Sequence, residues 1–344
     1  MCPPAKSGTR EHMSRAIQLL KAREAVEVVE VPLRAPGPAE VRLRIEACAL
    51  GQLDWNLLTL DGPPRLPLVP GHEALGVVEA VGIGCVLKIG ERVLVTPLAS
   101  SCGQCAACRG HEGRHCVGAS WRGIHVDGAL RTHLVTREQA LVPLELPLGI
   151  EPLPEVLPRE LAATLALCGG SLWTAVGAVN ALGLLNPSRV AVFGVGGVGH
   201  LAVQVARALG HQVFAADAEP ERVALALTLG ARPLDGPVDA AVVCTPSTQA
   251  LQQAVRLLRA GGRIALAGSS PTGRVDLAVA DLVWRGLTIR SGLLGTRGDL
   301  EEGVGLLFSG KVKPSVELVS LDEVPARLWA LRDLGFPGRL VVLP

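Results

Sequence analysis

A glycine-rich stretch near the middle of the chain limits the fold more than any other feature. Residues 190–193 form a short apolar run of the kind that makes a strand buried on both faces. Gly194, Gly196 and Gly199 follow with the spacing G-x-G-x-x-G, and residues 198–209 repeat apolar side chains at helical spacing. In such a turn the first glycine makes the tight bend, the second lets the backbone approach a diphosphate, and the third brings helix and strand together. The stretch therefore predicts a strand–turn–helix unit that binds a dinucleotide at the helix N-terminus.

The residues after this turn indicate which dinucleotide binds. A second strand at 212–216 ends at Asp217, at the separation where an acidic residue holds the adenosine ribose. A carboxylate there would repel the 2′-phosphate of NADP, so we expect NAD, although Arg222 could partly offset that repulsion. The alternative is a plain strand–turn–helix unit with a surface aspartate. The predicted cofactor-binding residues of this region are Gly194, Val195, Gly196, Gly197, Val198, Gly199, Asp217 and Arg222.

Strands and helices alternate on both sides of the turn. Because such alternation is typical of a parallel, doubly wound sheet, we expect an α/β domain here. The predicted helices cover residues 160–167, 171–182 and 220–229, and a fourth is capped by Ser247 and ends at Gly261-Gly262. The further predicted strands cover residues 239–244, 263–267 and 287–290.

The first part of the chain has a different pattern. Short strands separated by Gly/Pro turns are typical of a β-barrel or sandwich, and 344 residues are enough for two domains with real cores. A helix at 299–308 and a closing strand at 338–343 end the chain, and we expect that strand to return to the first domain. The predicted strands of the first part cover residues 25–32, 40–48, 75–81, 91–97, 130–135 and 140–143.

Four clustered cysteines predict a metal site. Two consecutive C-x-x-C steps and a fourth cysteine nearby can surround one ion tetrahedrally, and a lobe at about 100–118 has no apolar core of its own. All protein positions would be filled, so the zinc would be structural; buried thiols or disulfides are the alternative. His111 and His115 are rival ligands within the loop. The expected ligands are Cys102, Cys105, Cys108 and Cys116.

Composition excludes several other classes of function. A net charge of +1 gives no electrostatic case for binding nucleic acid, and no charge-free run reaches the length of a membrane span. Residues 1–12 lack the apolar core of a signal peptide, and we exclude them from the predicted fold. Nine cysteines with a metal-type spacing suit a reducing cytoplasm better than a disulfide scaffold.

Several motifs in one order resemble the zinc-containing medium-chain alcohol dehydrogenases. They are the Gly-His-Glu stretch at 71–82, the four-cysteine lobe, the glycine-rich turn and the segment at 292–300. The resemblance implies a GroES-like catalytic domain at 13–158 and 296–344 and a Rossmann domain at 159–295. It also implies hydride transfer between NAD(P) and a small alcohol or carbonyl compound in the cleft, by a homodimer or homotetramer.

The resemblance also implies a catalytic zinc with one open position. His72 matches the family's histidine ligand, Cys168 stands where a third ligand is frequent, and Asp54 matches the acid that orients the histidine. Arg339 matches a basic residue near that acid and the cofactor phosphates. Glu73 matches a carboxylate that can approach the metal.

One ligand position departs from the family pattern. Gly51 stands where the family has its first cysteine, and Leu53 replaces a hydroxyl that relays protons. Cys48 lies three residues upstream and is better explained as a small buried side chain. The site has therefore either recruited Glu73, to form a substitute zinc site with His72 and Cys168, or given up tight metal binding.

Three hypotheses for function follow from this departure. The first is an NAD-dependent dehydrogenase or reductase whose zinc polarises the substrate oxygen. The second is a reductase of the same fold with structural zinc only, like the quinone and enoyl reductases. The third is a cofactor-binding protein with weak or no turnover.

Overall fold

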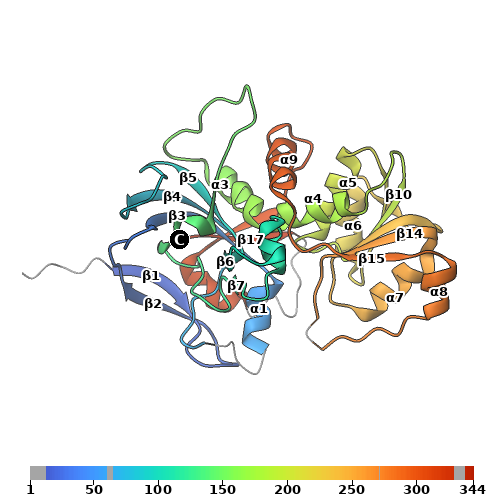
Figure 1. The fold of residues 1–344 in the computed structure, drawn as a ribbon, viewed down its shortest axis with the longest axis horizontal. Helices are drawn as coiled ribbons and strands as arrows, with labels where there is room; N and C mark the ends of the chain where they lie inside the picture. Colours follow the sequence, from blue (N-terminus) through green and yellow to red (C-terminus); the bar gives the residue numbers. More distant parts are fainter. Residues whose placement is uncertain (1–12, 60–64, 271, 329–337) are drawn as a thin grey trace, which may run out of the picture.

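The computed structural model describes residues 13–59, 65–270, 272–328 and 338–344. They form a β-rich lobe and an α/β lobe that lie side by side (Figure 1). Three helices lie near the junction: α3 (Arg159–Ala166), α4 (Ser171–Ala181) and α9 (Arg297–Phe308). The predicted fold class is thereby confirmed. The excluded N-terminal residues 1–12 lie outside the described part of the chain.

The β-rich lobe is built on a seven-stranded sheet. Its strand order is β16-β17-β3-β4-β5-β9, and β8 pairs with β3 off this path. The strands are β3 (Glu40–Leu50), β4 (Ala74–Val81), β5 (Arg92–Val95), β8 (His133–Arg137), β9 (Leu141–Pro143), β16 (Val316–Ser320) and β17 (Arg339–Leu343). β1 (Met13–Gln18) and β2 (Glu27–Pro32) form a separate antiparallel pair. Alternate β3 residues Val41, Leu43 and Ile45 are buried in the core of this lobe, as their spacing predicts.

The closing strand returns to the first lobe. β17 pairs antiparallel with β3, and Leu340 faces Leu50 across the pair. It thus brings Arg339 close to Gly51, just past the end of β3. This pairing places two residues that are far apart in the sequence side by side.

The α/β lobe has a six-stranded parallel sheet in the order β12-β11-β10-β13-β14-β15. Side chains of one strand alternate between two cores: Val190 and Val192 pack on one side, and Ala191 and Phe193 on the other. Burial on both faces explains the continuous apolar run in the sequence. The strands are β10 (Arg189–Phe193), β11 (Gln212–Ala216), β12 (Arg232–Pro233), β13 (Val238–Val243), β14 (Leu258–Leu266) and β15 (Thr288–Ser291).

Helices cover both faces of this sheet. α4 packs against α5 and α9, whereas α7 packs against β10, β13 and β14, and α3 packs against strands of the first lobe. Ser247 caps α7 by accepting a hydrogen bond from the Ala250 N–H at 3.2 Å. The helices are α3 (Arg159–Ala166), α4 (Ser171–Ala181), α5 (Gly199–Ala208), α6 (Pro220–Thr228), α7 (Thr248–Leu257), α8 (Val279–Trp284) and α9 (Arg297–Phe308).

Some elements differ from the sequence prediction. α7 ends at Leu257, before the glycine pair, because the chain from Leu258 already belongs to β14. Strands β1 and β16 and the short helix α1 (Gln52–Thr59) were not predicted. In the described part of the chain no single helix is long and apolar enough to cross a membrane; the bent pair Arg159–Gly169 and Ser171–Ala181 passes that test together, by length and composition only.

Candidate active site

The glycine-rich turn joins β10 to the start of α5. Gly194 has φ +85°, which strongly favours glycine. A Cβ on Gly199 would lie 1.8 Å from the Gly194 carbonyl oxygen, so the helix approaches the strand as closely as the third glycine allows. A Cβ on Gly196 would meet nothing nearer than 3.9 Å. The turn therefore leaves open backbone where a diphosphate would lie.

Asp217 lies at the end of β11, beside this turn. Its Oδ2 accepts a hydrogen bond from the Val195 N–H at 2.6 Å, and its Oδ1 accepts one from the Glu219 N–H at 3.0 Å. The side chain is 5% exposed, and Arg222 Nη1 lies 3.9 Å from Oδ1. The carboxylate is thus fixed against the cofactor loop, with one arginine at its edge.

A cleft of about 440 Å³ opens between the two lobes. Its walls combine the glycine-rich turn with His72 and Glu73 from the first lobe. Leu53 lines the cleft and gives it an apolar side chain. Trp55 and Leu57 do not line it, because both side chains pack into the core of the first lobe. A cleft of this volume can hold a small molecule beside a nicotinamide.

His72 is oriented by Asp54, which lies in α1. The Nδ1 of His72 lies 3.3 Å from Asp54 Oδ1, and Asp54 also accepts hydrogen bonds from the N–H groups of Gly51 (2.9 Å) and Gly71 (2.8 Å). Burial lowers the pKa of His72, but the charge and hydrogen bond of Asp54 outweigh it and the pKa is raised. With Nδ1 held by Asp54, Nε2 is the ring nitrogen left for a ligand in the cleft.

Glu73 is already fully bonded. Its Oε1 accepts hydrogen bonds from the backbone N–H of Ser171 at 2.9 Å and from the Ser171 hydroxyl at 2.6 Å, and its Oε2 pairs with the Arg339 guanidinium. The side chains of Glu73 and Arg339 are 1% and 9% exposed. Ser171 was not predicted as a site residue; its position at the start of α4, directly after Gly169-Gly170, was the only signal.

Arg339 connects three parts of the site. Besides pairing with Glu73, it covers Gly51: a Cβ there would lie 2.3 Å from Arg339 Nη1. A Cβ on Gly197, in the cofactor loop, would lie 2.7 Å from Arg339 Cδ. The Nε of Arg339 is buried and has no hydrogen-bond partner in the described part of the chain. An unpaired donor beside the glycine-rich turn is suited to a cofactor phosphate.

The side chains proposed for a catalytic zinc do not form a donor set here. A metal site needs at least three ligand atoms close together. In the described part of the chain, His72, Glu73 and Cys168 belong to no group of three or more His, Cys, Asp or Glu residues whose ligand atoms lie within 4.8 Å of one another. Cys168 is 1% exposed and does not line the cleft, and burial followed by the charge of Glu73 raises its pKa to about 12. The Glu73 oxygens are occupied, and Gly51 offers no donor. These residues, as arranged, do not fit a catalytic zinc.

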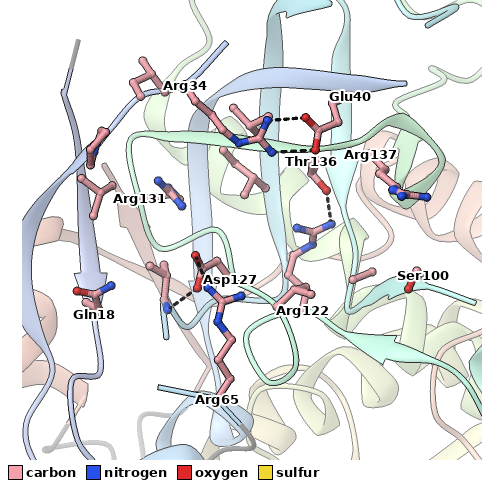
Figure 2. Close-up of a pocket in the computed structure, with 18 residues that line it drawn as sticks. Gln18, Arg34, Glu40, Arg65, Ser100, Arg122, Asp127, Arg131, Thr136 and Arg137 are labelled. Carbon is pink, nitrogen blue, oxygen red and sulfur yellow. Dashed lines mark hydrogen bonds and ion pairs between the residues drawn. The ribbon is translucent and has the colours of Figure 1, made fainter. Parts of the chain in front are cut away.

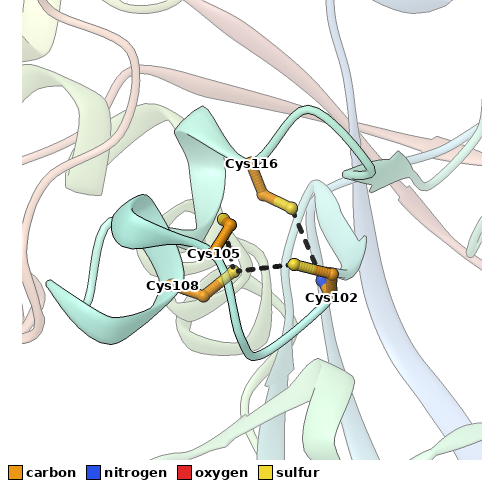
Figure 3. A group of neighbouring side chains, drawn as sticks. All are labelled: Cys102, Cys105, Cys108 and Cys116. Atoms are coloured by element: carbon orange, nitrogen blue, oxygen red, sulfur yellow. Dashed lines mark hydrogen bonds between the residues drawn. The ribbon is translucent and has the colours of Figure 1, made fainter.

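The four-cysteine lobe does form a donor set (Figure 3). The Sγ atoms of Cys102, Cys105, Cys108 and Cys116 all lie within 4.8 Å of one another. The Cys105–Cys108 and Cys102–Cys108 Sγ separations are 3.5 and 3.9 Å. A Zn–S bond of about 2.3 Å in a tetrahedron requires sulfurs about 3.8 Å apart, whereas a disulfide requires about 2 Å.

The thiols of this lobe differ in acidity. Backbone N–H groups of Gln104 and Cys105 lower the pKa of Cys102 to about 6. The backbone N–H of Cys108 lowers the pKa of Cys105, but a hydrogen bond with the Cys108 thiol and burial outweigh it, and that pKa is raised to about 11. His111 and His115 are not part of the sulfur cluster, and His115 Nε2 lies 3.7 Å from a Glu112 oxygen instead. The lobe therefore fits one closed, structural zinc.

Comparison with known proteins agrees with this geometry. Residues 37–146 match the alcohol dehydrogenase GroES-like domain, and residues 160–256 match the C-terminal domain of alanine dehydrogenase/PNT. An alcohol dehydrogenase of Geobacillus stearothermophilus is 33% identical over 326 residues, 90% of this chain and 92% of the relative. One of Rhizobium meliloti (strain 1021) is 33% identical over 92% of this chain and 94% of the relative.

Solved structures of similar shape lead to the same family. The alcohol dehydrogenase of the archaeon Aeropyrum pernix has a TM-score of 0.84 at 28% identity, covering 96% of this chain and 100% of that one. Acetophenone reductase of Geotrichum candidum NBRC 4597, in complex with NAD, has a TM-score of 0.82 at 25% identity, covering 98% and 99%. The chain belongs to the zinc-containing medium-chain alcohol dehydrogenase family and is an NAD(P)-dependent oxidoreductase.

Proposed function

We propose that this enzyme uses NAD to transfer hydride between the nicotinamide and a small alcohol or carbonyl compound, and that zinc is held only in the four-cysteine lobe. The preference for NAD over NADP rests on the carboxylate of Asp217, which is fixed beside the glycine-rich turn and would repel the extra phosphate of NADP. At about 5 Å and an effective dielectric constant of about 20, two like unit charges repel by about 3 kcal/mol. Arg222 is only 3.9 Å from that carboxylate and offsets part of this for NADP.

Fluorescence titration with NADH and NADPH tests this choice. We expect wild type to bind NADH at least about tenfold more tightly, which corresponds to about 1.4 kcal/mol. Asp217→Ser should reduce the difference, because the carboxylate is gone while Arg222 remains. Arg222→Gln is the matched control and should widen the difference. Equal binding of both cofactors by wild type would refute the proposal.

The residues of the cleft have distinct tasks in this proposal. NAD, when bound, would supply the hydride acceptor, and Arg339 and the open turn at Gly196 would hold its diphosphate. His72 exchanges a proton with the substrate oxygen through Nε2, while Asp54 keeps the ring oriented. Glu73 fixes Arg339 through the buried ion pair. Leu53 gives the substrate side an apolar wall.

Metal content distinguishes this proposal from a zinc-assisted reaction. We expect one zinc per chain by elemental analysis, because the cysteine lobe is complete whereas Glu73 and Gly51 leave the cleft without a donor set. Two tightly bound zinc ions per chain would refute it. Cofactor oxidation across alcohols, aldehydes, quinones and enones would then identify the substrate class. No turnover of any of them would favour a cofactor-binding protein.

We also propose that the enzyme is a homodimer joined at the free edge of the α/β sheet. β15 is the last strand of that sheet, and the neighbouring helix α8 exposes Val279, Val283 and Trp284 by 72%, 67% and 88%. A sheet edge beside exposed apolar side chains is a strong association surface. Trp284→Glu should shift the protein toward monomer in analytical ultracentrifugation, whereas Ile83→Glu, on an exposed loop of the other lobe, should not. A wild-type monomer would refute this assembly.

The state of the cysteines supports a reducing compartment. All eight cysteines in the described part of the chain are free of disulfides. Because a thiolate zinc site persists where thiols stay reduced, we propose that the enzyme works in the cytoplasm. Cell fractionation would test this, and recovery of the protein from an oxidising compartment would contradict it.

A further inference from the structure

A second cavity lies in the β-rich lobe, outside the cofactor cleft. Its volume is about 810 Å³, and strands and loops of the first 137 residues line it (Figure 2). The lining is unusual in its charge, because arginines outnumber carboxylates. The charged lining residues are Arg34, Arg65, Arg122, Arg131, Arg137, Glu40 and Asp127.

The two carboxylates of the lining are already neutralised. Glu40 forms a two-pronged pair with Arg34, including an Nη2–Oε1 contact of 2.8 Å, and this hydrogen bonding lowers the pKa of Glu40 to about 2. Asp127 accepts a hydrogen bond from the Val69 N–H at 3.2 Å and lies 3.8 Å from Arg65. Each carboxylate therefore balances one arginine.

Three guanidinium groups remain without a counter-charge. Within the described ranges, no carboxylate lies within 4.0 Å of Arg122, Arg131 or Arg137. Arg137 interacts with Glu40, and Arg131 with Asp127, only through longer-range charge attraction. The cavity thus concentrates positive charge in a recess of the surface, which attracts an anion.

Arg122 is the most deeply buried of the three arginines. Its side chain is 2% exposed, and one hydrogen bond, from Nη2 to the Thr136 hydroxyl at 3.0 Å, is the only one it donates in the described part of the chain. Its Nε and that of Arg131 are buried and have no hydrogen-bond partner among the described residues. Burial lowers the pKa of Arg122 to about 10, so it still carries its charge at neutral pH. A buried charge with unmade hydrogen bonds is costly unless a ligand supplies the missing partner.

We propose that this cavity binds a small organic or inorganic polyanion through Arg122, Arg131 and Arg137. The planar guanidinium fork matches the oxygens of phosphate and carboxylate groups, and more than one such group is needed to balance three arginines. The volume lies in the usual range for small-molecule sites of about 300–1,000 Å³. A neutral ligand would leave the charge unbalanced.

The proposed site shares a wall with the substrate cleft. Trp121 and Ile124 line the cleft, whereas Arg122 and Val126, in the same loop, line the arginine cavity. Val69 lines the cavity as well, three residues before His72. A bound anion would therefore contact the loop that forms one side of the cleft without entering the cleft.

Calorimetry with pyrophosphate and with citrate, at matched ionic strength, tests the proposal on the holoenzyme. NADH is kept saturating so that the glycine-rich turn is filled. We expect at least one of the two anions to bind with a dissociation constant below 1 mM, on the order of small-ligand sites. The pyrophosphate and citrate arms separate phosphate from carboxylate recognition. Failure of both anions to bind would overturn the proposal.

Substitutions then locate the site. Arg131→Gln and Arg122→Gln should each weaken binding at least tenfold. The first is the safer variant for folding, because Arg131 is less buried. Arg44→Gln is the matched control: it lies in the same lobe, is 46% exposed and does not line the cavity. Binding that is unchanged in both cavity variants, or that disappears when NADH is added, would refute the assignment.

Discussion

Gly51→Ala should displace Arg339 from its ion pair with Glu73 in the active site. The added Cβ would lie 2.3 Å from Arg339 Nη1 and 3.1 Å from its Cζ, so the guanidinium must move by about 1 Å to reach ordinary contact. That movement weakens the buried pair with Glu73, whose complete loss costs about 3–5 kcal/mol. A partial displacement should cost about 3 kcal/mol.

Another effect acts in the opposite direction. Gly51 does not have a positive φ, so alanine is compatible with its backbone and stabilises by about 0.4–1 kcal/mol through the unfolded chain. The net loss should be about 2 kcal/mol. With an unfolding entropy of about 2.1 cal/mol/K per residue, this corresponds to a thermal midpoint lower by about 3 °C. NADH affinity should fall as well, because Arg339 also contacts Gly197.

A double-mutant cycle with Arg339→Ala separates the clash from other effects. Once the guanidinium is removed, Gly51→Ala should stabilise the protein by about 0.4–1 kcal/mol through the unfolded chain, which leaves a coupling energy of about 3 kcal/mol. Gly305→Ala in α9 is the matched control, since its Cβ would meet nothing within 4 Å and alanine is the better helix residue. Equal destabilisation by Gly51→Ala with and without Arg339 would refute this reasoning.

Two further properties follow from the same structure. Cys116→Ser should release the zinc and lower the thermal midpoint of unfolding. Cys85→Ser, at a cysteine outside the cluster, should leave the zinc content unchanged. One zinc per chain in both variants would exclude the four-cysteine site. His200 is buried, its Nδ1 lies 2.9 Å from the Gly196 carbonyl oxygen, and burial lowers its pKa to about 4 from 6.5. Protonation of His200 therefore favours the unfolded chain, and this group should contribute a loss of about 3 kcal/mol between pH 7.5 and 4 in urea unfolding, in addition to the changes from other titrating groups. His200→Asn should lose less over that range, and an equal loss would contradict the assignment.

Local sequence rules predicted the parts of the fold that depend on neighbouring residues. The strand before Gly194, the turn and α5 follow from apolar spacing and glycine positions within about twenty residues. The cysteine cluster follows from the C-x-x-C steps for the same reason. β1 and β16 were missed because their polar and apolar residues give no clear two-residue period.

The catalytic centre depends on distant residues, which sequence spacing does not bring together. Gly51 in a ligand position was interpreted as the loss of the family's first cysteine ligand. In the structure this position is covered by Arg339, which reaches it from the last strand, 266 residues after its partner Glu73. Register between β17 and β3 creates this contact, and register is a tertiary property. Ser171 was missed for the same reason.

Charge balance alone would not keep a metal out of the cleft. Without metal, the carboxylates of Asp54 and Glu73, the guanidinium of Arg339 and a protonated His72 sum to zero. A divalent cation would also leave the site neutral if His72 and Cys168 each released a proton, so binding would compete with two protons and weaken as pH falls. Geometry is what opposes it: Cys168 lies in the core and both Glu73 oxygens are bonded. A metal would therefore have to break the Glu73–Arg339 pair, and the contact of Arg339 with the cofactor loop depends on that pair.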